Sequence, residues 1–263
     1  MSASSKRQFS KMSSAYLAFG VALITLMSII GLSVFLRITE LKVEGTSLYS
    51  ALEVVENSGL SKGDSLFFLS EQTVSQNIRE ALPFVSGVQV TRILPDTVLI
   101  DITESSAIAK IAHAGKLYVI DSSGRVIADS SESATILQGI DIDGLIEIRG
   151  VDISDAIVGS QLKVDFLAEA RLLNMQDILV ALEREGMEKD VSYLDVSNNR
   201  NMHFSYLGLY RVILGERSFL RLKLEVLPSK VEEIAVWHPN TPGDINMINV
   251  TETSNEVTFR PTS

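Results

Sequence analysis

Histidine is the residue type in this 263-residue chain best suited to acid–base or metal chemistry. The three histidines are His113, His203 and His238, and no pair has the His-x-x-x-His spacing that places two imidazoles on one helix face. Cysteine is absent, which excludes a thiol nucleophile, a disulfide framework and cysteine metal sites. The sequence therefore predicts no metal centre.

Other motifs with chemical potential are incomplete. The segment Asp141–Gly144, DIDG, is similar to the start of a calcium loop, but the remaining ligands and the distal glutamate are missing. Serine is plentiful, yet no G-x-S-x-G elbow is present, and the glycines stand at turns rather than in a phosphate-binding loop. We predict no catalytic residues and no cofactor. The formal charge of −10 also makes nucleic acid an unfavourable partner.

An uncharged apolar segment, Met12–Leu36, follows a short tail that contains only basic charges. About 20 apolar residues cross a bilayer core, and the positive-inside rule keeps the basic tail in the cytoplasm. We therefore predict a cytoplasmic tail over 1–14, a retained transmembrane helix over 15–36 and an exported remainder. A cleaved signal peptide would have a shorter apolar core with small residues before the cut, and a buried core helix would carry a polar face.

Behind the apolar segment the pattern predicts a strand and two short helices. Apolar residues alternate up to Gly45, as in a strand. The first helix ends at Gly59 and has a predicted apolar stripe of Leu48, Ala51, Leu52 and Val55. The second begins at the N-cap Ser70, ends before Pro83 and has a predicted apolar face of Val74, Ile78, Ala81 and Leu82.

Two more strands complete this first module. One strand shows strict alternation, with Val98, Ile100 and Ile102 on one face and the positions between them on the other. The preceding Pro95-Asp96 pair predicts a type I turn or a slightly longer hairpin loop. The order strand–helix–helix–strand–strand fits a β-α-α-β-β module over 37–105, in which one sheet face or an edge stays available for binding. We expect the module's core to include Phe67, Phe68 and Phe84.

The pattern then changes to a mostly antiparallel β domain with flanking helices over 106–260, so the fold class is α+β. A hairpin loop is predicted at Asp121–Gly124, and a helix ending at Gly186 carries Leu172, Met175, Leu179 and Leu182 at helical spacing. Three antiparallel strands follow in VSYLDVS, NMHFSYL and YRVILG. A helix is then expected up to Pro228, followed by a strand in EEIAVW, a closing hairpin and a short tail over 261–263. We expect Trp237, close to the end of that strand, to be a core anchor, and the alternative is an interface residue.

The ordered segments ITELKVEG, LFFLS and LPFVSGVQVTRILPDTVLIDITE resemble the POTRA module of the bacterial cell-division family FtsQ/DivIB. The later strands and the segment DINMINVTETSNEVTFRP are similar to that family's second domain. Two features depart from the pattern: the arginine and proline expected after Glu104 are missing, and Asn249 and Thr251 replace the usual aspartate and arginine.

This resemblance implies a non-enzymatic divisome scaffold in the plasma (inner) membrane, concentrated at the division septum. Such a protein would bind two single-pass coiled-coil proteins, FtsB/DivIC and FtsL, contact other divisome membrane proteins, and link early and late division proteins while coordinating septal wall synthesis.

The resemblance also directs attention to two groups of candidate partner-binding residues. An added strand from a partner would pair with the last strand, predicted as Asn255, Glu256, Val257, Thr258, Phe259 and Arg260. The alternative is an ordinary terminal strand that binds nothing. In the first module, Val90 and Arg92 are predicted to face a recruiting partner, or else Val90 is buried and Arg92 only solubilises the surface.

Two other functional classes stay open. A membrane-anchored envelope enzyme such as a cell-wall hydrolase would need a cleft with a nucleophile and base or paired carboxylates. A POTRA-bearing outer-membrane assembly factor would need repeated modules followed by the strands of a barrel. The sequence offers positive signs of neither.

Overall fold

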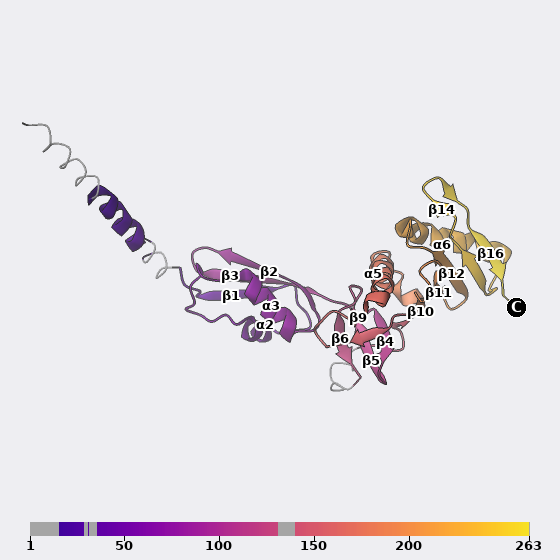
Figure 1. The fold of residues 1–263 in the computed structure, drawn as a ribbon, viewed down its shortest axis with the longest axis horizontal. Coiled ribbons are helices and arrows are strands. Elements are labelled where there is room, and N and C mark those ends of the chain that lie inside the picture. Colours follow the sequence, from indigo (N-terminus) through magenta and orange to yellow (C-terminus); the bar gives the residue numbers. More distant parts are fainter. Residues whose placement is uncertain (1–15, 29–30, 32–35, 131–139, 263) are drawn as a thin grey trace, which may run out of the picture. The chain divides into compact units, whose positions relative to one another are not determined.

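The computed structural model describes residues 16–28, 31, 36–130 and 140–262. Residues 16–28 are helical, and within the described ranges no helix has both the length and the apolar character needed to cross a membrane. The predicted span 15–36 lies partly outside these ranges, as does most of the polar segment 129–135. The chain divides into two compact units, 1–104 and 105–263 (Figure 1).

The first unit has the predicted β-α-α-β-β order. Its elements are β1 (Glu40–Glu44), α2 (Ala51–Ser58), α3 (Glu71–Ala81), β2 (Val85–Ile93) and β3 (Thr97–Glu104). The three strands form one sheet in the order β1-β3-β2, with β1 parallel and β2 antiparallel to the central β3. The predicted alternation on β3 is confirmed, because Val98, Ile100 and Ile102 are all buried.

Local capping chemistry sets the ends of the two helices. The Ser70 hydroxyl accepts the Thr73 N–H at 3.3 Å, and Gly59 ends α2 in the left-handed conformation with φ of 75°. These two predicted boundaries are confirmed. The predicted stripe on α2 is wrong, since Leu52 is exposed and the buried residues are Val54 and Ser58. Its N-cap is Ser50, so the first turn starts later and the helix presents a different face to the sheet.

The expectation that Phe67 and Phe68 fill the core is also wrong. Leu66 and Leu69 point inward at 1% and 8% exposure, whereas Phe67 and Phe68 are 62% and 73% exposed. The segment is an irregular turn, so burial falls on positions three apart rather than on the bulkiest residues. The two rings contact each other edge to face, with centroids 5.2 Å apart. Phe84 is half-buried.

Glu104, the last residue of β3, holds the turn that follows β1. Its Oε1 accepts hydrogen bonds from the Thr46 hydroxyl at 2.6 Å and from the Ser47 and Leu48 N–H groups at 2.7 and 2.8 Å. Burial alone would raise the pKa of this carboxyl, but these hydrogen bonds outweigh it and lower the pKa from 4.5 to about 2. The glutamate in the sequence motif therefore has a structural role.

The second unit contains a nine-stranded sheet in the order β16-β13-β12-β11-β10-β7-β4-β5-β6. From β4 onward the strands of this unit are β4 (Ala109–His113), β5 (Lys116–Ile120), β6 (Val126–Asp129), β7 (Ile146–Arg149), β8 (Ile153–Asp155), β9 (Lys163–Val164), β10 (Tyr193–Asp195), β11 (Met202–Tyr206), β12 (Tyr210–Gly215), β13 (Gly243–Asn246), β14 (Val250–Thr251), β15 (Ser254–Asn255) and β16 (Thr258–Pro261). The β10–β11–β12 meander is antiparallel as predicted. The sheet as a whole is mixed, because β4–β7, β7–β10 and β12–β13 pair in parallel.

Two helices supply the other half of the core of this unit. In α5 (Glu169–Arg184), Met175, Leu179 and Leu182 are fully buried, as their spacing predicted. In α6 (Leu220–Trp237), the buried apolar residues are Leu224, Leu227 and Val231. They belong to the same core cluster as the inward side chains of the sheet. The opposite face of β10 to β13 carries polar residues.

The predicted EEIAVW strand is wrong, because α6 continues through Pro228 to Trp237. A proline inside a helix costs about 3 kcal/mol. Here the buried apolar stripe of Leu224 and Leu227 continues past the proline to Val231. The burial of Leu227 and Val231 offsets the cost of the proline. Trp237 lies at the end of this helix and is 77% exposed, so its predicted core position is also wrong.

We predict that Glu104→Gln lowers the free energy of unfolding of the first unit by about 1–2 kcal/mol at neutral pH, because charge-assisted hydrogen bonds are replaced by weaker ones at a partly exposed site. The folded pKa of about 2 lies below 4.5, so the carboxylate stabilises fully above pH 4.5 and this contribution is lost as the pH falls toward 2. Urea unfolding across this pH range measures both effects.

Glu80→Gln is the matched control, since Glu80 is exposed and, among the residues that the structure describes, accepts a side-chain hydrogen bond only from Gln76 within α3. Equal stability losses in the two variants would contradict the role assigned to Glu104.

Candidate partner interface

The last strand, β16, forms one edge of the nine-stranded sheet. It pairs antiparallel with β13 on one side, with Phe259 opposite Ile245 and Arg260 opposite Asp244. Within the described chain no strand pairs with its other side. The bounds of the last strand differ from the predicted 255–260, because β16 covers Thr258–Pro261. Asn255 belongs instead to β15, which forms a small hairpin with β14.

The opposite edge of the sheet is covered by the chain itself. The Val126 N–H of β6 donates to the Ser160 carbonyl at 2.9 Å, and the Gly159 N–H donates to the Val126 carbonyl at 2.8 Å. Every residue of β6 is buried. An exposed strand edge invites pairing with another chain unless it is blocked. The two ends of this sheet thus differ: β6 is blocked, and β16 offers an edge.

The printed contacts define which backbone groups face this edge. The Thr262 N–H donates to the Pro242 carbonyl at 3.0 Å, so Thr262 faces β13. Backbone direction alternates along an antiparallel strand. Arg260 and Thr258 therefore also face β13, whereas the N–H and carbonyl of Phe259 and the carbonyl of Pro261 point outward. Proline has no N–H to offer, which is why it is tolerated at this outward position of an edge strand.

An aromatic contact fixes β16 to the sheet. The Phe259 ring lies 6.1 Å from the Tyr210 ring, nearly perpendicular to it, and 5.2 Å from the His238 imidazole. A Cβ on Gly243 would stand 2.5 Å from the Phe259 ring and 2.6 Å from the Arg260 carbonyl oxygen. The absence of a side chain at Gly243 lets the ring lie directly over the backbone of β13. His238 therefore packs against β16.

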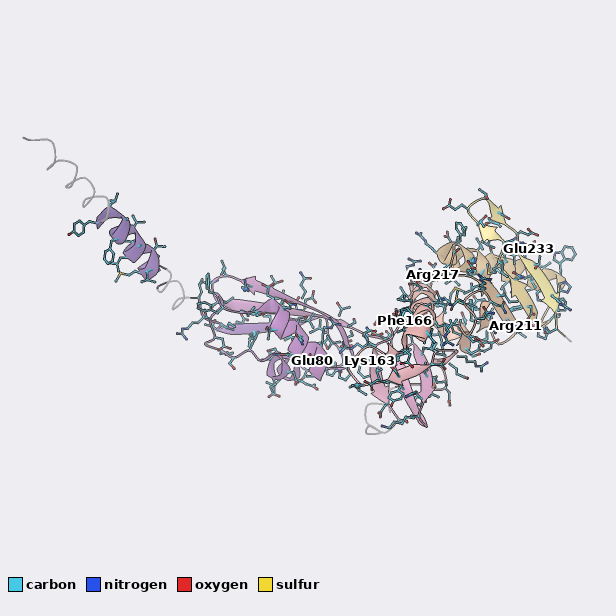
Figure 2. The ribbon with its side chains drawn as sticks, in the orientation of Figure 1. Glu80, Lys163, Phe166, Arg211, Arg217 and Glu233 are labelled. Atoms are coloured by element: carbon cyan, nitrogen blue, oxygen red, sulfur yellow. The ribbon has the colours of Figure 1, made fainter. Side chains whose placement is uncertain are left out.

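A row of alternating charges crosses the polar face of the sheet toward the edge. Register places Arg211 of β12 beside Asp244 of β13, and Asp244 beside Arg260 of β16. The Arg211 side chain, which Figure 2 labels, forms a bidentate pair with Asp244: its Nε donates to one carboxylate oxygen at 2.9 Å, and the guanidinium also reaches the second oxygen. This hydrogen bonding raises the pKa of Arg211. The exposed Arg260 leaves a basic group at the outermost position of the row.

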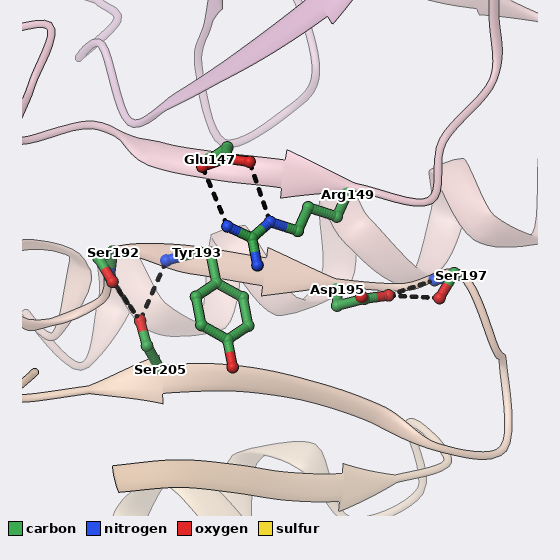
Figure 3. A network of polar contacts seen from close by, with 7 residues as sticks. All are labelled: Glu147, Arg149, Ser192, Tyr193, Asp195, Ser197 and Ser205. Atoms are coloured by element: carbon green, nitrogen blue, oxygen red, sulfur yellow. Dashed lines mark hydrogen bonds and ion pairs between the residues drawn. The ribbon is translucent and has the colours of Figure 1, made fainter. Parts of the chain in front are cut away.

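The polar face continues inward with a second network, on β7, β10 and β11 (Figure 3). The Arg149 guanidinium lies 4.3 Å from the centre of the Tyr193 ring, and its Nε donates to Glu147 at 2.9 Å. The hydrogen bond with Glu147 raises the pKa of Arg149. Because Tyr193 stands opposite Glu147 in the β7–β10 register, the cluster joins two strands.

Three serines complete this network in Figure 3. The Ser205 hydroxyl accepts the Ser192 N–H at 2.8 Å and the Tyr193 N–H at 3.0 Å, while Ser197 donates to the Asp195 carboxylate through its N–H at 2.9 Å. Burial alone would raise the pKa of Asp195, but the hydrogen bonds from Ser197 lower it. These serines bind backbone and carboxylate groups, and the Ser205 contacts join β11 to β10.

The two predicted residues of the first unit lie on β2, which is also an edge strand. Val90 is 7% exposed and packs in the core. Arg92 donates to the Leu69 carbonyl at 2.6 Å and lies 3.5 Å from the Glu71 carboxylate, so it joins β2 to the start of α3. A partner contact at these two positions stays a prediction.

Within the described ranges, no cluster of three or more His, Asp or Glu residues is arranged to hold a metal ion. A hollow of about 330 Å³ beside α5 is lined by Ala170, Leu173, Asn174, Asn199, Arg200, Glu216 and Arg217, without serine or histidine. The sequence also contains an S-x-x-K motif, Ser160–Lys163. Its lysine Nζ lies 3.3 Å from the Asp155 carboxylate, and the Ser160 carbonyl accepts the Val126 N–H of β6, so both residues have structural partners.

Comparisons with known proteins agree on one family. The FtsQ-type POTRA domain model matches residues 36–105. The cell division protein DivIB of Clostridium acetobutylicum is 25% identical over 68% of this chain and 67% of its own length. The cell division protein FtsQ of Corynebacterium glutamicum is 30% identical over 50% of this chain and 55% of its own length. DivIB of Clostridium tetani is 21% identical over 72% and 68% of the two chains.

We predict that Gly243→Ala weakens the attachment of β16, because the new methyl group overlaps the Phe259 ring and the Arg260 carbonyl. Overpacking of this kind costs about 1–3 kcal/mol. Hydrogen exchange of the Thr258 and Arg260 amides, which face β13, should accelerate relative to the amides of β11.

Phe259→Ala in the same background removes the overlapping ring, so the two substitutions should couple in a double-mutant cycle. Additive losses, or wild-type exchange in Gly243→Ala, would show that the ring does not lie over Gly243.

Proposed function

Because the chain belongs to the FtsQ/DivIB family of cell division proteins, we propose that it is a non-enzymatic scaffold of the divisome. In this role it binds FtsB/DivIC-type and FtsL-type bitopic proteins at the septum, links early and late division proteins, and coordinates septal wall synthesis. The open edge of β16 is the single observation that carries the proposal, since the other edge of the same sheet is covered by Gly159 and Ser160.

We also propose that Met12–Leu36 anchors the protein in the plasma (inner) membrane with the N-terminus in the cytoplasm. The support is the sequence: the segment is uncharged and longer than the roughly 20 residues that a bilayer core requires. Only basic charges precede it, which favours a cytoplasmic N-terminus. Both folded units would then lie outside the cytoplasm.

Partner binding would proceed by strand addition to β16. The Phe259 N–H and carbonyl and the Pro261 carbonyl would bond to the partner backbone, which supplies affinity without dependence on sequence. Specificity would come from side chains beside the edge. Arg260 favours an acidic partner residue on the polar face, and Trp237 exposes an aromatic surface next to His238, whose ring contacts Phe259.

The first unit would contact other divisome membrane proteins. Val90 and Arg92 remain the predicted contacts, but Val90 is buried and Arg92 is engaged with Leu69. A recruiting partner at β2 would therefore use the backbone edge of the strand more than these two side chains.

Site-directed cross-linking tests the proposed strand addition, because the chain contains no native cysteine. Thr258→Cys and Arg260→Cys place thiols on β16 without removing its outward backbone groups. Adjacent strands bring opposite Cβ atoms to about 4.5–5.5 Å, close to the range that a disulfide needs. We expect each variant to form a disulfide with single-cysteine variants of the extracytoplasmic part of an FtsB/DivIC-type partner, in a register that advances by two residues.

His203→Cys is the control, since His203 lies on the same face three strands inside the sheet. A partner that cross-links equally to positions 203 and 258, or to neither β16 position while binding the full chain, would refute strand addition at this edge.

A further inference from the structure

The first unit carries an exposed apolar patch that the proposed function does not use. Its members are Phe67 and Phe68 after the turn at 61–65, and Ile93 and Leu94 at the end of β2, with exposures of 62%, 73%, 43% and 69%. Two separate segments of the chain supply them. Backbone contacts determine where both segments lie relative to the start of the unit.

The first segment pairs with the residues that directly follow the apolar run. The Leu66 N–H donates to the Leu36 carbonyl at 2.9 Å, and Arg37 forms an antiparallel bridge with Ser65. In an antiparallel pair, advancing along one chain means moving backward along the other. From Ser65 to Phe67 the chain therefore runs toward Leu36, the last residue of the apolar run.

The second segment reaches the same end of the unit by another route. β1 leads away from Leu36 and pairs in parallel with β3, so the antiparallel β2 runs back toward Leu36. The Thr39 N–H donates to the Asp96 carbonyl at 2.9 Å, which places the β2–β3 turn beside the beginning of β1. Leu94 lies in that turn. All four apolar residues thus lie at the end of the unit that Leu36 begins.

Charges around the patch suit a lipid surface. Arg37 and Lys62 are exposed basic residues in the same region. The nearby carboxylates of Asp64 and Asp96 accept hydrogen bonds from the unit's own groups. Aromatic rings and basic side chains together are typical of segments that lie at the bilayer–water interface.

We propose that Phe67, Phe68, Ile93 and Leu94 form a second membrane contact that inserts into the interfacial layer of the bilayer and restricts the tilt of the POTRA unit. The inference rests on the proposed anchor at Met12–Leu36. Suppose that Leu36 lies at the edge of the hydrocarbon core. Phe67 then lies about one residue along the chain direction from that edge. The headgroup layer on each side of the core is only about 5–7 Å thick. The rings therefore reach lipid without any movement of the unit.

Depth-dependent fluorescence quenching tests the contact in the full chain. Trp237 is the single tryptophan, so Trp237→Phe provides a background in which Phe67→Trp and Leu94→Trp are introduced one at a time. The chain is reconstituted into phosphatidylcholine–phosphatidylglycerol vesicles with or without brominated acyl chains. We expect the emission of both reporters to fall in brominated vesicles. We also expect both to emit at a shorter wavelength in vesicles than the same variants do when unfolded in buffer without detergent.

Two further reporters separate the possible failures. Leu48→Trp is the exposed control at the far end of β3, since the Leu48 N–H binds Glu104 at the end of that eight-residue strand, about 25 Å away. Ile24→Trp reports on the proposed anchor. Quenching at 24, 67 and 94 but not at 48 supports the inference. Quenching at 24 alone overturns it, and no quenching at 24 overturns the anchor together with the inference.

Discussion

Backbone hydrogen bonding at the margins of a sheet is the constraint on which the second unit depends. In the part of the chain that the structure describes, nine strands form one sheet, and its two outermost strands each have backbone groups without a neighbouring strand. At β6 the chain meets this constraint with its own segment around Gly159 and Ser160, and every residue of the strand is buried. At β16 the outward backbone groups have no such cover from the described chain. The side chains around that edge, from Phe259 to Arg260, hold the strand in place without covering its outer side.

Features that depend on neighbouring residues were predictable from the sequence. Ser70 and Gly59 cap helices through contacts within a few residues, and the alternation of Val98, Ile100 and Ile102 follows directly from strand geometry. The path of α6 through Pro228 was not predictable from local propensity. It depends on burial of Leu227 and Val231 against strands elsewhere in the chain. The exposure of Phe67 and Phe68 follows from the shape of an irregular turn, which hydrophobicity alone does not encode.

The candidate interface shows the same division. A terminal strand with alternating side chains was visible in the sequence, and Phe259 does pack inward as alternation requires. Its exact bounds were not visible, because Asn255 is drawn into the β14–β15 hairpin and Val257 lies between the two elements. The need for glycine at 243 was also hidden. It arises from a ring sixteen positions later, and only the pairing of β13 with β16 brings the two together.

Pro261 has a consequence for which chains can use the open margin. Two copies of this protein that met edge to edge would each bring a position with no donor, so a symmetric pair would forfeit hydrogen bonds on both sides. A different chain loses only one such hydrogen bond, because its N–H can still bind the Pro261 carbonyl while its own carbonyl finds no donor there. One residue without an N–H thereby disfavours self-association and leaves the edge to a heterologous chain.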